Sequence, residues 1–227
     1  MRLPHAVDYP ADVRVIALPV KLLAEAKTRL DPLLTPLERG ALTLAMLEDV
    51  LDATLELSGW ETWVISPDEA VLEIAVLRGV RAMQEDKPPL GNAVRQVEEE
   101  ATAGGADALA ILLADTPLVT AGALTRALHT LGPVVVAPSA DESGTNLLVR
   151  RPPAVIRARF GSDSYRKHLE TAAETGVPTS VVELPELAFD LDLPGDILTL
   201  LEARKRGRTF AVCLEMDLRA RLSARTT

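Results

Sequence analysis

Cysteine and aromatic residues are scarce in this chain of 227 residues. Its one cysteine, Cys213, excludes an internal disulfide and is typical of a protein from a reducing cytoplasm. Cys213 lies in an apolar run, so we interpret it as buried packing rather than as a nucleophile. Aromatic residues make up 3% of the chain and hydrophobic residues 48%, which predicts a large aliphatic core.

Long hydrophobic runs are also lacking. The longest, Ala108 to Ala114, is far shorter than the ~20 residues that span a bilayer. Residues 1–12 carry proline and charge but no apolar centre, so they do not resemble a signal peptide. The formal net charge of -9 argues against broad affinity for nucleic acid. We therefore expect a cytoplasmic protein with neither a membrane nor a nucleic acid as partner.

Three common catalytic motifs are missing as well. The chain has no G-x-x-x-x-G-K-[ST] loop and no G-x-G-x-x-G loop, which disfavours P-loop NTPases and ordinary dinucleotide dehydrogenases. It also has no G-x-S-x-G elbow, which disfavours a Ser-His-Asp hydrolase.

Strand-like and helix-like segments alternate along the chain, without repeats or a composition break. This alternation predicts one α/β domain with a mostly parallel sheet and helices on both faces. We expect a flexible leader (1–12), a single domain (13–206) and a C-terminal tail without an assigned structure (207–227). The expected strands are 13–18, 60–65, 107–114, 134–137, 146–150, 180–184 and 187–192. The expected helices are 36–57, 67–79, 93–103, 121–131, 164–175 and 194–206, with a polar loop over 81–89.

Two carboxylates, Asp190 and Asp192, follow an apolar run with one residue between them. Because side chains alternate along an extended chain, both point to the same side, where their repulsion favours a bound cation. Magnesium suits them, since it prefers hard oxygen ligands and substrate phosphates. Asp115 ends the clearest buried strand and is a third candidate ligand. Each of the three is also compatible with a solvated turn.

A basic stretch follows the first predicted strand. Lys21, Lys27 and Arg29 place three cations within nine residues. Ligands bind beyond the carboxyl ends of strands in open α/β sheets, so these cations are candidates for binding phosphate. A helix with its charges on a solvated face would show the same spacing.

The segment before the helix at 164–175 has the features of an anion site. Gly161 allows close approach of the backbone, and Ser164 opens a helix whose first N–H groups lack partners. An ordinary helix cap would look the same. His168 lies on the same helix face as Ser164, and we predict that it is exposed on the surface.

Several short motifs, taken in order, resemble one family. The chain resembles the 2-phospho-L-lactate and phosphoenolpyruvate guanylyltransferases of deazaflavin coenzyme F-420 biosynthesis over roughly residues 13 to 200. The matching blocks are Pro19-Val20-Lys21-x-Leu23-x-x-Ala26-Lys27-x-Arg29-Leu30, Ala114-Asp115-x-Pro117-Leu118, Gly144-Thr145-Asn146, Phe160-Gly161-x-x-Ser164-Tyr165-x-x-His168 and Phe189-Asp190-x-Asp192-x-Pro194-x-Asp196.

The resemblance implies a Rossmann-like nucleotidyltransferase fold of the glycosyltransferase-A type. It implies an enzyme that joins GMP from GTP to a small phosphorylated three-carbon acid and releases pyrophosphate. A homodimer is compatible with it. By the same resemblance, Mg²⁺ and the catalytic centre belong to Asp115, Asp190 and Asp192. The acid belongs to Thr145, Gly161 and Ser164, and GTP to Lys21, Lys27, Arg29 and Asn92.

Two departures from the family pattern stand out. The family usually has Gly-Leu-Asn-x-Ala in its guanine-binding region, where this chain has Leu90-Gly91-Asn92-Ala93. It also tends to have Asp-Thr-Pro-Glu-Asp where this chain has Asp192-Leu193-Pro194-Gly195-Asp196, so a helix cap is lost. Two other classes stay open. They are a molybdopterin- or sugar-phosphate nucleotidyltransferase, although those usually carry a Gly-rich N-terminal loop, and a non-catalytic nucleotide-binding module.

Overall fold

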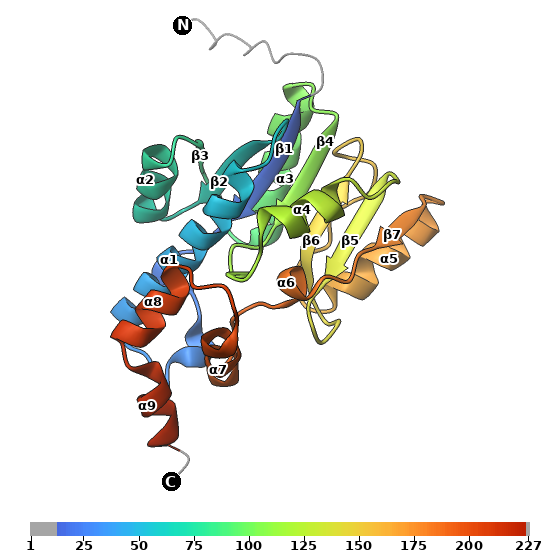
Figure 1. Cartoon of the computed structure of the whole chain (residues 1–227). Helices are drawn as coiled ribbons and strands as arrows, with labels where there is room; N and C mark the ends of the chain where they lie inside the picture. The colour runs from blue at the N-terminus through green and yellow to red at the C-terminus, as the bar shows by residue number, and fades with distance from the viewer. Residues whose placement is uncertain (1–12, 226–227) are drawn as a thin grey trace, which may run out of the picture.

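A seven-stranded sheet forms the centre of the protein (Figure 1). The structure is a computed structural model and describes residues 13–225; the predicted leader lies outside the described residues. The strand order is β3-β2-β1-β4-β6-β5-β7. The strands are β1 Arg14–Pro19, β2 Glu61–Ser66, β3 Arg81–Gln84, β4 Ala108–Leu112, β5 Val134–Pro138, β6 Thr145–Arg150 and β7 Thr179–Val181.

The sheet is mostly parallel, as the sequence predicts. β1 pairs in parallel with β2 and β4, and β5 pairs in parallel with β7. Within the described sheet, β6 is antiparallel to both of its neighbours, β4 and β5. All five residues of β4 are buried, because helices cover the sheet on both faces.

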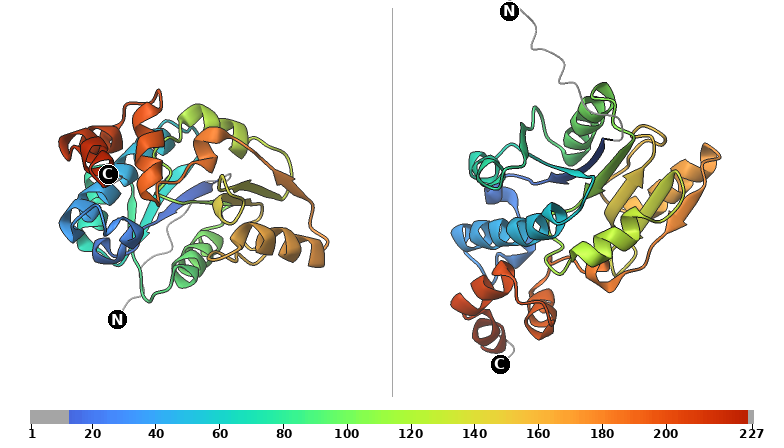
Figure 2. Two further views of the ribbon diagram at one scale, coloured as in Figure 1. Left: turned by 90° about the horizontal axis from the view of Figure 1, so that it is seen from below. Right: turned by 45° about the horizontal axis from the view of Figure 1, so that its top comes forward.

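Figure 2 shows the helices in two layers. One layer contains α1, α2, α4 and α6, which share one apolar cluster. The other layer contains α3 and α5, which pack on two separate apolar clusters. The helices are α1 Pro36–Leu55, α2 Glu69–Leu77, α3 Leu90–Ala103, α4 Ala121–Leu128, α5 Ser164–Glu174, α6 Pro185–Ala188, α7 Pro194–Glu202, α8 Arg208–Glu215 and α9 Leu218–Ser223. None of these helices is both long enough and apolar enough to cross a bilayer.

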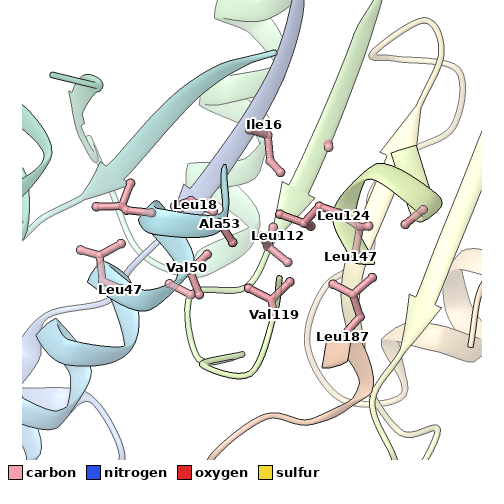
Figure 3. Packing of buried hydrophobic residues seen from close by; sticks show 14 of the residues in the cluster. Ile16, Leu18, Leu47, Val50, Ala53, Leu112, Val119, Leu124, Leu147 and Leu187 are labelled. Atoms are coloured by element: carbon pink, nitrogen blue, oxygen red, sulfur yellow. The ribbon is translucent and has the colours of Figure 1, made fainter. Parts of the chain in front are cut away.

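The largest apolar cluster is aliphatic, as the composition predicts. Figure 3 shows Leu18 of β1 and Leu112 of β4 meeting Val50 of α1 and Leu124 of α4. These four side chains are fully buried. The cluster fixes the carboxyl ends of β1 and β4 against α1, which matters for the loops that follow these strands.

Two local predictions differ from the structure. The expected loop at 81–89 begins with strand β3, a short edge strand that pairs in parallel with β2. The expected strand at 187–192 is wrong: Pro185 opens the short helix α6, and the residues after it are extended without a strand partner. A proline at the first helical position favours that turn of helix.

The tail that the sequence left unassigned contains helices α8 and α9. Asp49 of α1 is buried and caps α8 from outside, accepting hydrogen bonds from the amides of Arg208 and Thr209 at 2.7 and 2.9 Å. Lys205 donates to the carbonyls of Pro117 and Val119, both at 2.8 Å. The C-terminal segment is therefore tied to α1 and to the loop that follows Asp115.

Candidate active site

Four segments meet at one edge of the sheet. β1 and β4 end there, and β6 begins there because it runs in the opposite direction. Asp115 follows β4, Thr145 opens β6, and the basic stretch 20–30 follows β1. The fourth segment links α6 to α7 and carries Asp190 and Asp192. Its place is fixed by a main-chain hydrogen bond of 3.0 Å from Leu191 to the carbonyl of Asp115.

Lys27 connects the two acidic segments. Its Nζ lies 2.8 Å from Asp115 Oδ2 and 2.6 Å from Asp192 Oδ1. The Lys27 side chain is only 7% exposed. Burial alone lowers the pKa of Lys27, but the two carboxylates outweigh it and the pKa is raised. Lys27 is therefore held as a cation between its partners.

The backbone around Lys27 is shaped to present this side chain. The stretch forms two short 3-10 turns, Leu23–Glu25 and Thr28–Leu30, rather than the continuous helix that was the alternative. Lys27 stands between them in the left-handed region, with φ 53°. Arg39 of α1 is buried beneath the stretch, donates to the carbonyl of Ala26 and pairs with Asp31 at 2.7 Å. Arg39 thus braces the basic stretch from below.

Asp190 is not one of the two carboxylates that pair with Lys27, but burial and the negative charges of those two carboxylates raise its pKa. Asn146 Nδ2 donates to the carbonyl of Ala188 at 3.1 Å and to Asp190 Oδ1 at 3.4 Å. Burial, followed by the nearby charge of Asp115, raises the pKa of Asp190 to about 6. Leu191 between the two aspartates is fully buried, while Asp190 contacts Asn146 and Asp192 contacts Lys27.

Asp196 compensates for the missing cap at the start of α7. Leu193 supplies no side-chain cap, as the sequence predicts. The carboxylate of Asp196 accepts hydrogen bonds from the amides of Asp192 and Leu193, at 2.8 and 2.6 Å. The backbone of Asp192 is therefore held by Asp196, and its side chain remains directed at Lys27.

The carboxylates of this cluster are oxygen ligands of the kind that a hard metal ion takes. Within residues 13–225, no group of three or more His, Cys, Asp or Glu side chains is arranged to hold one. However, Asp115 Oδ1 is buried and accepts no hydrogen bond from the described residues. A buried carboxylate oxygen without a partner is costly, and carboxylate oxygens are the ligands that Mg²⁺ prefers. The donor chemistry therefore fits a hard cation, while Lys27 bridges the outer carboxylates.

The predicted acid-binding residues lie at the start of β6 and α5. Thr145 and Ser164 are buried, and Gly161 has φ 116°, a conformation that side chains rarely adopt. His168 is also buried, so the prediction of a surface histidine is wrong. Its ring contacts the Thr145 hydroxyl at 3.0 Å and joins α5 to β6. These contacts bring the residues from two motifs to one place.

A cavity of about 300 Å³ lies beside the aspartates. Lys21, Lys27 and Arg29 line it together with Asp115 and Asp192. Asn92 does not line this cavity. It is half-buried, and its side-chain amide donates to the carbonyl of Pro88 at 2.9 Å. Leu90 is the cavity-lining residue of that segment.

Sequence reasoning assigned no function to three residues of this site. Asn146, Arg39 and His168 hold functional candidates in place without lining the cavity. The Gly144-Thr145-Asn146 motif was a sequence signal for Asn146. The spacing of four residues between Ser164 and His168 was a signal for His168. The role of Arg39 left no signal, because its contacts with Asp31 and with the carbonyl of Ala26 follow no sequence motif.

The fold and the site define a protein with the architecture of nucleotidyltransferases. A solved nucleotidyl transferase from Methanothermobacter thermautotrophicus superposes with a TM-score of 0.61 at 19% identity, covering 84% of this chain and 96% of that one. A solved nucleotide-diphospho-sugar transferase homologue from Desulfovibrio desulfuricans G20 gives 0.73 at 20% identity, with 93% and 99% covered. At these identities the likeness concerns the fold.

The family follows from the sequence. The model of the family "Guanylyl transferase CofC like" matches residues 13–224, and the chain belongs to this family. The match includes all of α8 and α9.

Three curated relatives carry different acceptor names. A phosphoenolpyruvate guanylyltransferase from Rubrobacter xylanophilus is 39% identical, covering 81% of this chain and 91% of the relative. A 2-phospho-L-lactate guanylyltransferase from Methanothermobacter thermautotrophicus is 35% identical, with 79% and 80% covered. A 3-phospho-D-glycerate guanylyltransferase from Phenylobacterium zucineum is 32% identical, with 86% and 93% covered.

Proposed function

We propose that this protein transfers GMP from GTP to phosphoenolpyruvate, or to the closely related 2-phospho-L-lactate, and releases pyrophosphate. This places it in deazaflavin coenzyme F-420 biosynthesis, in the cytoplasm. One observation supports the proposal above the others: the cavity beside Asp115 and Asp192 is lined by Lys21, Lys27 and Arg29. A site that brings two anions together needs this concentration of cations in a chain whose net charge is -9.

The reaction requires no general base. A phosphate oxygen of the acid forms a bond to the α-phosphorus of GTP, and the bond from that phosphorus to the bridging oxygen of pyrophosphate breaks. A phosphate monoester is mostly a dianion at neutral pH, because its second pKa is ~6. This agrees with the structure of the site, in which His168 is buried and both of its ring nitrogens have partners.

The chain's own residues bind and orient the two substrates. Lys21, Lys27 and Arg29 bind the triphosphate and stabilise the charge that collects on the departing pyrophosphate. The acid binds at Thr145, Gly161 and Ser164, beside the N-terminus of α5, because the start of a helix favours an anion. Asn92 contributes to the guanine end.

Asp115, Asp190 and Asp192 would hold Mg²⁺. The support is the unpartnered Oδ1 of Asp115 and the raised pKa of Asp190, both of which a cation would relieve. When bound, Mg²⁺ neutralises phosphate charge and aligns the in-line attack. Lys27 then contacts phosphate oxygens in addition to the aspartates.

Phosphoenolpyruvate is the acceptor we favour. Relatives at 39% and 37% identity carry phosphoenolpyruvate in their names, while those named for the other two acids are at 38% or less. The acids differ by few atoms, so the preference rests on small differences around Thr145 and Ser164.

The deciding experiment measures pyrophosphate release from GTP and Mg²⁺ with phosphoenolpyruvate, 2-phospho-L-lactate and 3-phospho-D-glycerate in turn. We expect the fastest release with phosphoenolpyruvate, and formation of the guanylylated acid by mass spectrometry. Release with a sugar phosphate or a molybdopterin instead would point to another nucleotidyltransferase. GTP binding without any release would point to a non-catalytic module. Light scattering after gel filtration would test the expected homodimer.

A further inference from the structure

His168 is enclosed between α5, β6 and the loop before α5. Its exposed fraction is 0%, and both ring nitrogens have a partner. Nδ1 lies 3.0 Å from the hydroxyl oxygen of Thr145. Nε2 accepts a hydrogen bond of 2.8 Å from the backbone amide of Arg159. Phe160 packs edge-on against the ring, with 5.1 Å between the centroids.

These contacts determine where the ring carries its proton. A backbone N–H can only donate, so Nε2 must be the unprotonated nitrogen. A neutral imidazole then has its proton on Nδ1, which donates to the Thr145 oxygen. The ring stays neutral, because burial and then the charges of Arg150 and Arg159 lower the pKa of His168 to about 3.

Because of the direction of this bond, the donor capacity of the Thr145 hydroxyl is unused. The oxygen accepts from His168, so the hydroxyl hydrogen is free to donate elsewhere. Among residues 13–225, the Thr145 hydroxyl makes no hydrogen bond other than the one with His168. A buried donor without an acceptor costs free energy that a bound acceptor would recover.

We propose that His168 is a positioning residue, which fixes the Thr145 hydroxyl as a donor to an anionic oxygen of the acceptor acid. This inference rests on the proposed function, because it takes the acid as the ligand beside Thr145. Ser164 lies one helical turn before His168 on α5. Helix α5 therefore carries Ser164, a candidate acid-binding residue, and His168, which orients the hydroxyl of Thr145.

The test uses a pair of neutral substitutions that separate the two ring nitrogens. An asparagine amide can occupy the place of Nδ1–H, and a glutamine oxygen can occupy that of Nε2. We expect His168→Asn to keep the KM for phosphoenolpyruvate within about 3-fold of wild type. We expect His168→Gln and Thr145→Val to raise it roughly 10- to 100-fold, as for a lost bond to a charged group. The KM for GTP should change less than 2-fold in all three.

Two further measurements separate positioning from simple structural support. The double variant Thr145→Val/His168→Gln should have the KM for the acid of Thr145→Val alone, since His168 acts through that hydroxyl. Melting temperatures identify loss of fold, and the exposed His129→Gln serves as the histidine control. Additive effects, or equal KM increases in His168→Asn and His168→Gln, would overturn the proposal.

Failure of the proposed function would look different. If wild type releases no pyrophosphate with any of the three acids, the function fails, and calorimetric titration with phosphoenolpyruvate replaces the KM values. The nitrogen shifts of His168 in the full-length protein, measured by NMR, test the tautomer independently. A proton on Nδ1 supports the proposal, and a proton on Nε2 overturns it.

Discussion

The main-chain amide of Leu191 donates a hydrogen bond of 3.0 Å to the carbonyl of Asp115. This bond joins segments that are 76 residues apart (191 minus 115) and brings Asp190 and Asp192 to the carboxyl end of β4. Leu191 itself is fully buried, which anchors the backbone between the two carboxylates. The acidic half of the site is thus assembled by backbone contacts rather than by the carboxylates.

Removing either carboxylate of this pair should stop turnover without unfolding the protein. We expect Asp190→Ala and Asp192→Ala each to lower kcat by at least about 100-fold, because the charge balance of the phosphates is lost. Pyrophosphate release and melting temperature are the measurements. Asp107→Ala, an exposed aspartate at the opposite end of β4, is the control. Near-normal activity in both variants would remove the aspartates from the catalytic centre.

Lys27 should contribute to the stability of the fold as well as to the binding of GTP. Lys27→Met leaves Asp115 and Asp192 without their buried cation, which we expect to cost on the order of 2 kcal/mol. This is less than for a fully buried pair, because both carboxylates keep some exposure. Millimolar Mg²⁺ should restore much of the melting temperature by taking the vacated place. The measurement is thermal unfolding with and without Mg²⁺.

Lys21→Met is the matched control for that experiment, because Lys21 lines the same cavity without an ion pair among the described residues. We expect it to raise the KM for GTP while leaving the melting temperature unchanged. An equal drop in both variants would mean that Lys27 is not a special partner of the aspartates.

The C-terminal segment should support the GTP half of the site. A Cβ at Gly207 would fall well inside 3.0 Å of the Asp49 carboxylate that caps α8. Gly207→Ala should therefore destabilise the protein by on the order of 2–3 kcal/mol, through loss of the cap and its buried bonds. The KM for GTP should rise too, since Leu30 of the basic stretch packs in the cluster of Cys213 and Leu218.

Urea unfolding and initial rates measure these two effects. Gly195→Ala is the control, because its Cβ would meet nothing within 4 Å. If Gly207→Ala is as stable as that control, the contact between α1 and α8 does not hold the tail.

His168 should make stability depend on pH. Its pKa is about 3 in the folded protein and near 6.5 when unfolded, so the unfolded chain binds the extra proton between these values. Stability from this group is complete above pH 6.5 and is lost as the pH falls toward 3. At ~1.36 kcal/mol per unit, the stability advantage over His168→Asn should shrink by roughly 2 kcal/mol from pH 7 to 5. Urea unfolding at the two pH values measures it, and a constant difference would contradict the depressed pKa.

The sequence by itself determined most of the sheet and its covering helices, and the family. Apolar runs such as Ala108–Leu112 have few alternatives to a buried strand, and the capping box at Thr35 defines the start of α1. The order of the motifs pointed to the right family, because they lie at loops that parallel strands bring to one edge. Local composition was sufficient for these conclusions.

Only the tertiary structure decided which side chains meet. That Lys27 lies between Asp115 and Asp192 depends on contacts across 88 and 165 residues. That His168 is buried depends on the packing of α5 against β6, since its helical position is equally compatible with an exposed face. The tail, too, is ordered by Asp49 on a distant helix rather than by a signal of its own. Such contacts arise when separate segments share one core, and no local pattern encodes them.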